Sequence, residues 1–314
     1  MTVKIMDQQP RDHGGNLDAA VARFGGARAD WIDLSTGINP VAYPVPNLDG
    51  DVWSALPDQG AYDRLIGAAR TFWSVPEDAA ILAAPGCSAL IAQIPTLRPA
   101  GQVQIADATY NEHRAAFLAQ GWTVGAGQAE VIVHPNNPTG DFATTAPVAL
   151  LTVIDESFCD VASNRSLIAS ASRDGVIILK SFGKFWGLAG MRLGFAIGDP
   201  ALIADLKDRL GPWAVSGPAL QVGAAALQDH AWAAETRTRL VADAAHLDAL
   251  MAQHGAVPMG DVSLFRTYEA PDAAALQTRL AKAHIWTRVF PYAPNWIRLG
   301  LPAPDQWARL ESAL

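Results

Sequence analysis

Short apolar runs alternate with stretches of helical periodicity through the middle of the chain. The runs rich in Val, Ile and Leu cover residues 102–107, 130–135, 150–157, 175–182 and 192–198. Helical patterns at 112–120 and 164–172 lie between some of them. Continuous branched runs separated by helices are typical of a parallel sheet that is buried on both faces. The pattern therefore predicts an α/β fold with a mostly parallel sheet, in which the run 192–198 is antiparallel because its connection is too short for a crossover helix.

The last third of the chain has a different pattern. After Pro218 an Ala-rich stretch predicts one long helix to about His254. A smaller α+β pattern follows, with strand-like runs at 262–268, 285–290 and 296–301, a helix near 273–283 and a final helix. We therefore expect an N-terminal arm at 1–30 that packs near this last part, a large domain at 31–215 and a smaller C-terminal domain at 216–314.

Composition and charge exclude some classes of partner. The chain has 314 residues, half of them apolar, so it can bury a large core. Acidic residues outnumber basic ones by 31 to 23, a net charge of −8. This balance argues against nucleic acid or an anionic membrane as the partner. It does not exclude a small anionic substrate, because a pocket can be locally basic.

The two cysteines, Cys87 and Cys159, cannot form a disulfide framework and belong to no CxxC pair, which favours a reduced compartment. The first residues lack the apolar core of a signal peptide, and no apolar run reaches the length of a membrane span. We therefore expect a cytoplasmic protein.

One lysine is a candidate for covalent chemistry. Lys184 lies in the Gly-rich, mostly apolar segment 181–194. Desolvation favours the neutral amine, which is the form that attacks a carbonyl. Ser181 and Arg192 are placed to bind an anion beside it. The alternative is a surface lysine in a flexible loop.

Further candidates follow other predicted strands, and active sites of α/β sheets gather at the carboxyl ends of the strands. Asn137 lies in a tight turn, where it presents an amide to a ligand or only shapes the turn. Asp155 and Glu156 end a strand, where a carboxylate pairs with a protonated heterocycle or caps the next element. His134 has no second ligand at zinc spacing, so we expect no metal site.

Gly86 precedes a predicted helix start, whose free N–H groups suit a phosphate. Ser88 either joins that anion site or is only a helix cap. Cys87 lies beside it without a partner base in the sequence, so we do not expect a nucleophilic thiol.

The order of these groups resembles the fold-type-I pyridoxal-phosphate (PLP) enzymes of the class I and II aminotransferase superfamily. The motifs that carry it are NNPTG, VIDE, and Lys184 followed by GLAGMRLG, and the resemblance spans nearly the whole chain. It implies the PLP-dependent transferase fold, with a large domain and a smaller C-terminal domain. It also implies a PLP cofactor and a homodimer in which each site is completed by its neighbour.

Residue by residue, the resemblance implies that Lys184 binds the cofactor covalently and then shuttles protons. Asp155 pairs with the ring nitrogen, Tyr110 stacks on the ring and Asn137 bonds the ring hydroxyl oxygen. The cofactor phosphate is held by Gly86, Cys87, Ser88, Ser181 and Arg192.

Within the superfamily the chain is similar to histidinol-phosphate aminotransferases and to the threonine-phosphate decarboxylases of cobalamin biosynthesis. The segments DHGGNLDAA, WIDLSTGINPVAYP and GPWAVS favour the decarboxylases. That resemblance implies conversion of L-threonine O-3-phosphate to (R)-1-amino-2-propanol O-2-phosphate. The substrate anions would be held by His13, Asn16, Arg288 and Arg298. The alternatives are an aminotransferase acting on a phosphorylated amino substrate such as histidinol phosphate, and a non-catalytic assembly partner.

Three features depart from the family pattern. Leu56 stands where the aminotransferases have a tyrosine that reaches the neighbouring subunit's cofactor phosphate, so either Tyr62 replaces it or the bond is missing. Phe158 stands where histidinol-phosphate aminotransferases have a tyrosine beside the ring hydroxyl. The segment 141–149 is too short for the usual helix.

Overall fold

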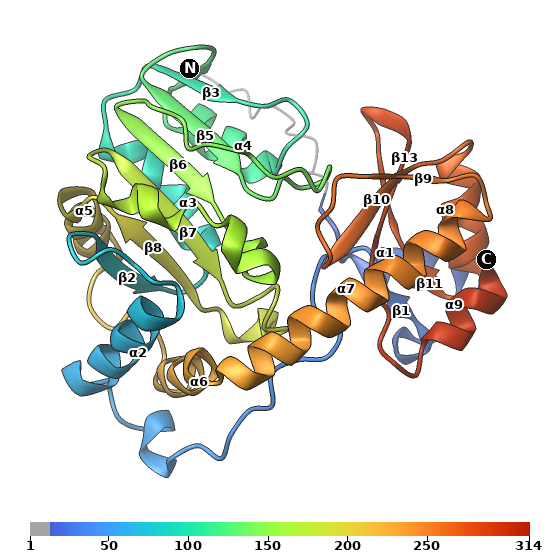
Figure 1. The fold of residues 1–314 in the computed structure, drawn as a ribbon, viewed down its shortest axis with the longest axis horizontal. Helices are drawn as coiled ribbons and strands as arrows, with labels where there is room; N and C mark the ends of the chain where they lie inside the picture. The colour runs from blue at the N-terminus through green and yellow to red at the C-terminus, as the bar shows by residue number, and fades with distance from the viewer. Residues whose placement is uncertain (1–12) are drawn as a thin grey trace, which may run out of the picture.

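The computed structural model describes residues 13–314, which form a large lobe and a small lobe (Figure 1). A seven-stranded sheet forms the large lobe, with the strand order β2-β8-β7-β6-β5-β3-β4. Strands β4, β3, β5, β6 and β7 are parallel, whereas β8 pairs antiparallel with both β7 and β2. The bounds are β2 Ala80–Ala84, β3 Gln102–Ile105, β4 Thr123–Val124, β5 Ala129–Val133, β6 Leu151–Asp155, β7 Val176–Ser181 and β8 Gly194–Gly198. The antiparallel placement of the run 192–198 is thus confirmed.

Helices cover both faces of this sheet because its central strands are apolar on both sides. On one face, Val153 and Ile177 pack with the side chains of α3 (Cys87–Gln93) and α5 (Pro200–Leu210). On the other face, Ile154 and Ile178 pack with α2 (Gln59–Phe72) and α6 (Gly217–Gln228). Residues 153 and 154 alternate between the faces, as successive residues of a strand do. Helix α4 (Asn111–Ala119) lies where a helix was predicted at 112–120.

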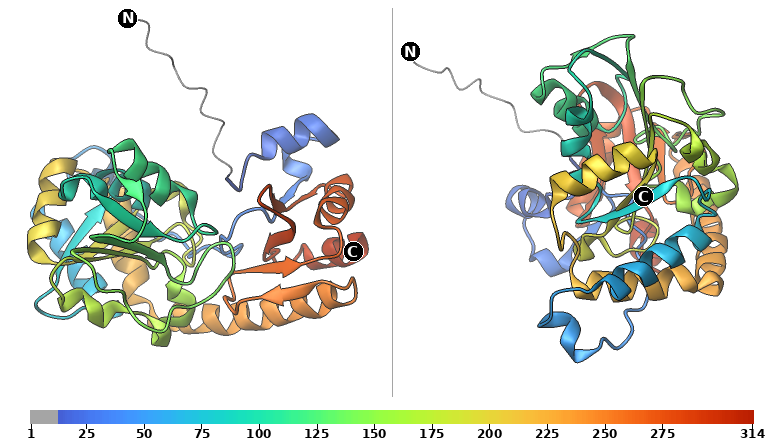
Figure 2. Two further views of the ribbon diagram at one scale, coloured as in Figure 1. Left: turned by 90° about the horizontal axis from the view of Figure 1, so that it is seen from above. Right: turned by 90° about the vertical axis from the view of Figure 1, so that its left-hand side faces the viewer.

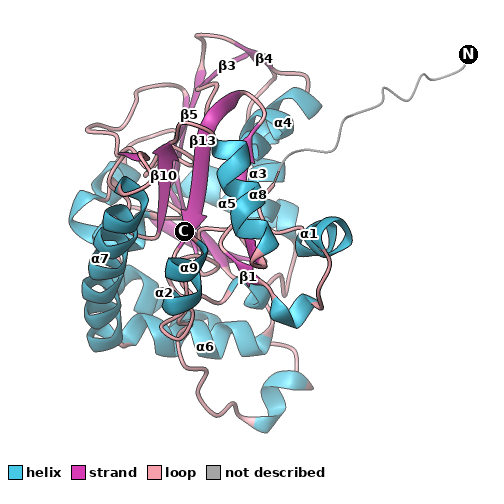
Figure 3. Cartoon of the chain, turned by 90° about the vertical axis from the view of Figure 1, so that its right-hand side faces the viewer, coloured by secondary structure: helices cyan, strands magenta, loops and turns pink. Residues whose placement is uncertain are grey.

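The small lobe contains a four-stranded antiparallel sheet, in the order β12-β13-β10-β9, and a two-stranded parallel pair, β1-β11. Helices α1, α8 and α9 accompany them (Figure 3). Their bounds are α1 Leu17–Phe24, β1 Ile32–Asp33, β9 Val257–Met259, β10 Phe265–Glu269, α8 Ala273–Lys282, β11 Ile285–Trp286, β12 Arg288–Phe290, β13 Ala293–Gly300 and α9 Trp307–Ala313. Helix α1 packs against α8, so this part of the N-terminal arm lies beside the small lobe, as expected (Figure 2).

The helix predicted from Pro218 to about His254 is wrong as a single element. The structure has two helices, α6 and the 23-residue α7 (His230–Ala252), which links the lobes (Figure 1). The break falls at Asp229, whose side chain accepts a hydrogen bond from the Trp232 amide at 2.9 Å and so caps the second helix. Neither α7 nor another helix within residues 13–314 carries an apolar stretch able to cross a bilayer.

Two other local predictions need comment. The expected helix at 164–172 is wrong, because this segment contains short 3-10 turns, η4 (Cys159–Arg165) and η5 (Ile168–Ser172). The segment 141–149 contains no helix, as expected. The remaining 3-10 turns are η1 Arg28–Asp30, η2 Gly50–Trp53, η3 Ile94–Leu97 and η6 Ala189–Met191.

The predicted domain boundaries after residues 30 and 215 stay predictions, and contacts cross both of them. Strand β1, which follows the first boundary, pairs with β11 of the small lobe. Helix α6, which follows the second, packs along α2 of the large lobe.

Candidate active site

A cavity opens at the carboxyl ends of β5, β6 and β7. Parallel strands present these ends at one edge of the sheet, so residues far apart in sequence meet there. The lining includes eight of the predicted site residues, namely Cys87, Ser88, Tyr110, Asn137, Asp155, Ser181, Lys184 and Arg192. The structure therefore brings the predicted cofactor-binding groups into one place.

Lys184 follows β7 in a loop that the backbone holds in position. Its carbonyl oxygen accepts hydrogen bonds from the Asn39 and Gly187 amides, both at 3.0 Å. The Nζ atom lies 5.2 Å from the centroid of the Phe158 ring. Burial, together with the nearby charge of Arg298, lowers the pKa of Lys184 to about 8. About a tenth of this amine is therefore neutral at pH 7, the form that attacks an aldehyde.

Asp155 ends β6 with its carboxylate buried in the cavity wall. One oxygen lies 2.8 Å from Nε2 of His113, and the other accepts from the Ser157 amide at 3.0 Å. Burial raises the pKa of Asp155, but His113 and Ser157 outweigh it and hold the pKa below its usual value. The carboxylate is thus ionised and able to favour a cation in the cavity.

Glu156 points away from the cavity, to the opposite face of the sheet. Its carboxylate lies 2.6 Å from Nζ of Lys180, which also lies 3.5 Å from Asp160. The turn η4 starts at Cys159, so neither Asp155 nor Glu156 caps it. The sequence left open whether these carboxylates face a ligand or cap the next element. Asp155 faces the cavity, and neither Asp155 nor Glu156 caps the turn.

His134 lies behind the sheet near this ion cluster. Its Nδ1 accepts from the Ala143 amide at 3.0 Å, and its Nε2 lies 2.8 Å from the Arg165 carbonyl oxygen. The Glu156 carboxylate and the Cys159 thiol, both possible metal ligands, have atoms within 4.8 Å of the His134 ring nitrogens. Both ring nitrogens, however, bond to the backbone. His134 thus serves as a structural residue.

Gly86 and Arg192 form the anion-binding end of the cavity. Gly86 has a φ of 84° and precedes α3, whose first amides face the cavity end. A Cβ on Gly86 would lie 2.4 Å from Nη2 of Arg192, so only glycine lets the guanidinium lie against the helix start. Arg192 itself is left-handed, with a φ of 55°, and donates to the Ala189 carbonyl oxygen at 3.0 Å. Both a guanidinium and free N–H groups suit a phosphate.

Ser181, Ser88 and Cys87 complete this end. The Ser181 hydroxyl accepts from the Gly183 amide at 3.2 Å. Ser88 is exposed inside α3, and Gly86 occupies the cap position, so Ser88 is not the helix cap. Burial raises the pKa of Cys87 to about 12, and its thiol donates to the Lys180 carbonyl oxygen at 3.0 Å. The neutral thiol agrees with the expectation that Cys87 is no nucleophile.

Tyr110 lies at the start of α4 and forms part of the wall of the cavity that Lys184 also lines. Burial and the charges of Asp155 and Glu112 raise its pKa to about 12. The ring therefore carries a neutral hydroxyl at physiological pH.

Asn137 and Arg298 join the cavity to the small lobe. Arg298 on β13 is buried, and its guanidinium donates to the Asn137 side-chain oxygen and, at 2.6 Å, to the Ser35 carbonyl oxygen. Because the oxygen of Asn137 accepts this bond, its NH₂ group is left to donate elsewhere. Arg298 thus fixes the orientation of the Asn137 amide.

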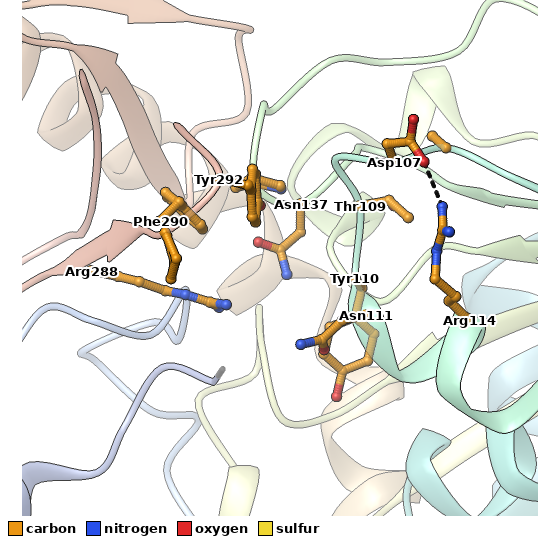
Figure 4. Close-up of a pocket in the computed structure, with 12 residues that line it drawn as sticks. Asp107, Thr109, Tyr110, Asn111, Arg114, Asn137, Arg288, Phe290 and Tyr292 are labelled. Carbon is orange, nitrogen blue, oxygen red and sulfur yellow. Dashed lines mark hydrogen bonds and ion pairs between the residues drawn. The ribbon is translucent and has the colours of Figure 1, made fainter. Parts of the chain in front are cut away.

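A second pocket forms the outer part of the site, between the lobes (Figure 4). Arg288 and Tyr292 come from the small lobe, while Tyr110 and Arg114 come from the large lobe, with Asn137 between them. Arg288 is therefore at the mouth, next to the cavity that holds Lys184.

His13 and Asn16 differ in their placement. The His13 ring lies 6.4 Å from that of Tyr110, and its Nε2 lies 2.9 Å from a carboxylate oxygen of Glu112. Asn16 is exposed at the start of α1, with a φ of 33°, and lines neither pocket. The structure thus brings His13 to the mouth but not Asn16, so a substrate contact for Asn16 remains a prediction.

Sequence reasoning missed His113, Ser157, Glu112 and Ser35. His113 follows Tyr110 by three residues, a spacing that puts both on one face of a helix, and this was the available signal. Ser35 had no such signal, because the two residues through which it acts on the site, Gly15 and Arg298, are 20 and 263 residues away.

The departures from the family pattern are also placed. The Tyr62 hydroxyl lies 3.3 Å from the Val215 amide nitrogen of its own chain. Leu56 is 67% exposed, and Phe158 packs edge-to-face with Phe265 at 5.1 Å. Tyr62 thus has a hydrogen-bond partner within its own lobe, and its replacement of the missing tyrosine stays a prediction.

The side chains that line this cavity fit PLP. They combine an amine of low pKa, a buried ionised carboxylate, an aromatic ring, an amide and an anion-binding end. The anion-binding end has room for a phosphate because residue 86 is glycine, and a Cβ there would fill that space. No described residue opposes the fit with a like charge at the anion-binding end.

Comparisons with known proteins agree with this geometry. Residues 125–313 match the family "Aminotransferase class I and II". The chain is 40% identical to a threonine-phosphate decarboxylase of a Sinorhizobium species, with 94% of each chain covered. The chain belongs to the class I and II aminotransferase family.

Members of this family are PLP-dependent enzymes, and so is this protein. It is also 38% identical to a threonine-phosphate decarboxylase of Pseudomonas aeruginosa, with 96% of this chain and 97% of the relative covered. The fold matches a histidinol-phosphate aminotransferase of Sinorhizobium meliloti in complex with PLP, with a TM-score of 0.83, 19% identity and coverage of 100% of this chain and 96% of that one. The predicted fold class and cofactor are confirmed.

Proposed function

We propose that the protein is a PLP-dependent carboxy-lyase that converts L-threonine O-3-phosphate to (R)-1-amino-2-propanol O-2-phosphate, a reaction of cobalamin biosynthesis. The names of its relatives, which match it over nearly the whole chain, support this substrate. The observation that carries the proposal is the pair of arginines near the mouth of the site. Arg288 lines the mouth, and the buried Arg298 lies behind Asn137, which lines both pockets. With His13 beside Tyr110, these donors suit a substrate with two anionic groups.

Lys184, Asp155, Tyr110 and Asn137 would hold the cofactor ring, and its phosphate would lie against Gly86, Cys87, Ser88, Ser181 and Arg192. When bound, PLP supplies an electron sink for a bond that breaks at the substrate α-carbon. Asp155 keeps its negative charge beside the ring site, because His113 and Ser157 stabilise the carboxylate. Lys184 donates a proton from Nζ to the α-carbon once carbon dioxide has left.

The choice between losing carbon dioxide and losing the α-proton is a matter of substrate orientation. Arg288, Arg298 and His13 bind the phosphate and the carboxylate, and so decide which bond of the α-carbon is aligned with the electron sink. Arg298 is held by two acceptors, so it offers a fixed anchor for this alignment.

The direct test is incubation of the holoenzyme with L-threonine phosphate. We expect carbon dioxide and aminopropanol phosphate in equal amounts, without a need for 2-oxoglutarate. Amino transfer to 2-oxoglutarate without carbon dioxide would make the enzyme an aminotransferase for a phosphorylated amino substrate instead.

A second test addresses Lys184. Borohydride reduction should fix the cofactor to the wild-type chain and fail to fix it to a Lys184→Ala variant. A reducible adduct at full level in that variant would refute the role of Lys184. A purified protein without the yellow band of a cofactor imine would favour a non-catalytic partner.

The enzyme is proposed to act as a homodimer in the cytoplasm. An apolar surface supports the dimer, since Trp53, Leu56 and Trp213 are 73%, 67% and 55% exposed and line one groove beside the loop that carries Gly190. Large exposed apolar groups of this kind mark interfaces. The free, buried thiols Cys87 and Cys159 are compatible with a reducing compartment.

A further inference from the structure

The described part of the N-terminal arm begins at the mouth of the site and is held at two places. Its root is α1, where Leu17 and Ala20 form a small apolar cluster with Trp31 and with Ala281 of α8. Its tip, residues 13–15, lies across the mouth next to Arg298. Two contacts hold the tip: His13 pairs with Glu112 of the large lobe, and Gly15 is bound by Ser35 of the small lobe.

Ser35 is a buried polar residue, 1% exposed, on the segment that leaves β1. Its hydroxyl donates to Oδ1 of Asp33 at 2.6 Å and accepts from the Gly15 amide at 2.7 Å. A hydroxyl polarised by a carboxylate is a strong acceptor. The hydroxyl therefore links the arm to the body of the small lobe.

The backbone of Ser35 holds the substrate-binding arginine at the same time. Its carbonyl oxygen accepts from Nη2 of Arg298 at 2.6 Å. Gly14 lies close to both atoms of this hydrogen bond. A Cβ on residue 14 would be 2.3 Å from the Ser35 carbonyl oxygen and 3.3 Å from Nη2 of Arg298. The arm tip thus fits beside Arg298 only without a side chain at residue 14.

The segment around Ser35 is itself fixed by backbone pairing. The Leu34 amide donates to the Trp286 carbonyl oxygen and the Leu34 carbonyl oxygen accepts from the Gly300 amide, both at 2.7 Å. The position of Ser35 is therefore set by the small lobe and does not depend on the arm.

We propose that Ser35 is a positioning residue that seats the N-terminal arm beside Arg298 and so places His13 at the mouth of the substrate site. For its substrate this inference rests on the proposed function, in which His13 and Arg298 bind the anionic groups of threonine phosphate. Ser35 itself touches neither substrate nor cofactor and acts through Gly15 and Arg298.

The first experiment follows amide hydrogen exchange in the holoenzyme by mass spectrometry. Ser35→Ala should speed exchange in the peptide that contains Gly15 by about five- to tenfold, the usual effect of one lost hydrogen bond on an opening equilibrium. Protection of α1 should remain, because its apolar cluster is untouched. Unchanged exchange at Gly15 would overturn the proposal, and so would equal loss of protection throughout the small lobe.

The second experiment is kinetic. Ser35→Ala keeps the carbonyl oxygen that anchors Arg298 and loses the contact to the arm, so its effect falls on His13, which this proposal assigns to the substrate phosphate. KM for threonine phosphate should rise about five- to tenfold with kcat within twofold. The affinity for L-threonine, which lacks the phosphate, should stay the same when it is followed through the cofactor absorption band. A merely structural defect would weaken both ligands, and that result would count against the proposal.

A second variant perturbs the other side of the contact. Gly14→Ala introduces a Cβ that clashes with the Ser35 oxygen, while residue 14 precedes α1 and carries no core packing. It should reproduce both effects of Ser35→Ala. Gly67→Ala is the matched control, because its Cβ would meet no atom within 4 Å. If the Gly14→Ala protein behaves like the Gly67→Ala protein, the proposal that Ser35 holds the arm beside Arg298 is refuted.

The two proposals fail separately. If the wild-type enzyme does not decarboxylate threonine phosphate, the proposed function fails, and the exchange experiment alone then decides whether Ser35 holds the arm.

Discussion

The reactivity of Lys184 in the cofactor-free protein is a direct consequence of its surroundings. Burial and the charge of Arg298 lower its pKa from 10.5 to about 8. At pH 7 an amine with a pKa of about 8 is about 9% neutral, whereas one with a pKa of 10.5 is about 0.03% neutral. Since only the neutral amine is nucleophilic, the reactive form of Lys184 should be about 300 times more abundant than that of an ordinary lysine at this pH.

Competitive labelling measures this difference. Cofactor-free protein is treated with trace acetic anhydride between pH 6 and pH 11, and modification at each lysine is counted by peptide mass spectrometry. Labelling of Lys184 should rise with a midpoint near pH 8. The exposed Lys282 in the same sample corrects for reagent decay, since each sample contains both sites.

A charge variant tests the cause. Arg298→Met removes the second largest contribution to the low pKa, so the midpoint for Lys184 should move to higher pH. Arg209→Met removes a distant exposed guanidinium and should leave the midpoint in place. A wild-type midpoint near pH 10.5, or equal midpoints in both variants, would show that the reasoning about burial and charge is mistaken.

Further predictions concern the buried charges. Lys180→Met leaves the carboxylate of Glu156 buried without its cation, so urea unfolding at pH 7 should show a loss of about 3–5 kcal/mol, and a loss below about 1 kcal/mol would contradict a buried ion pair. His113→Phe removes a hydrogen bond to the charged Asp155 and should lower the unfolding free energy of the cofactor-free protein by about 1.5–3 kcal/mol; an unchanged denaturation midpoint would count against it. The pKa values of Asp155 and Glu156 are lowered in the folded state, so the two carboxylates stabilise the fold at neutral pH. This stabilisation should be lost as the pH falls below about 4. Measuring the thermal midpoint of the wild-type and Glu156→Gln proteins against pH would check it.

The sheet was predictable because its signal is local. Runs such as 150–157 and 175–182 combine length, branching and flanking turns, and they became β6 and β7. The antiparallel β8 followed from a connection too short for a crossover. The break at Asp229 was missed because the Ala-rich pattern continues across it, whereas Asp229 leaves the helical conformation, with a ψ of 74°, and caps α7.

The site divides in the same way. Lys184, Asp155 and Asn137 stand in motifs whose residues are close in sequence, so the order of the motifs indicated their place. His113 and Ser35 act through partners that only the folded chain brings near, 42 residues away for His113 and Asp155. The spacing of Tyr110 and His113 was the local mark of one such contact, whereas the contacts of Ser35 with Gly15 and Arg298 left none.

The buried thiols have a practical consequence for labelling. Burial raises the pKa of Cys87 to about 12, so only about one thiol in 10⁵ is ionised at pH 7. The pKa of Cys159 is likewise raised by burial. With no other cysteine in the chain, a thiol introduced at exposed His13 would be the group that a maleimide dye reaches in the folded protein. A dye at this position would report on the surroundings of the N-terminal arm without any need to replace the native thiols first.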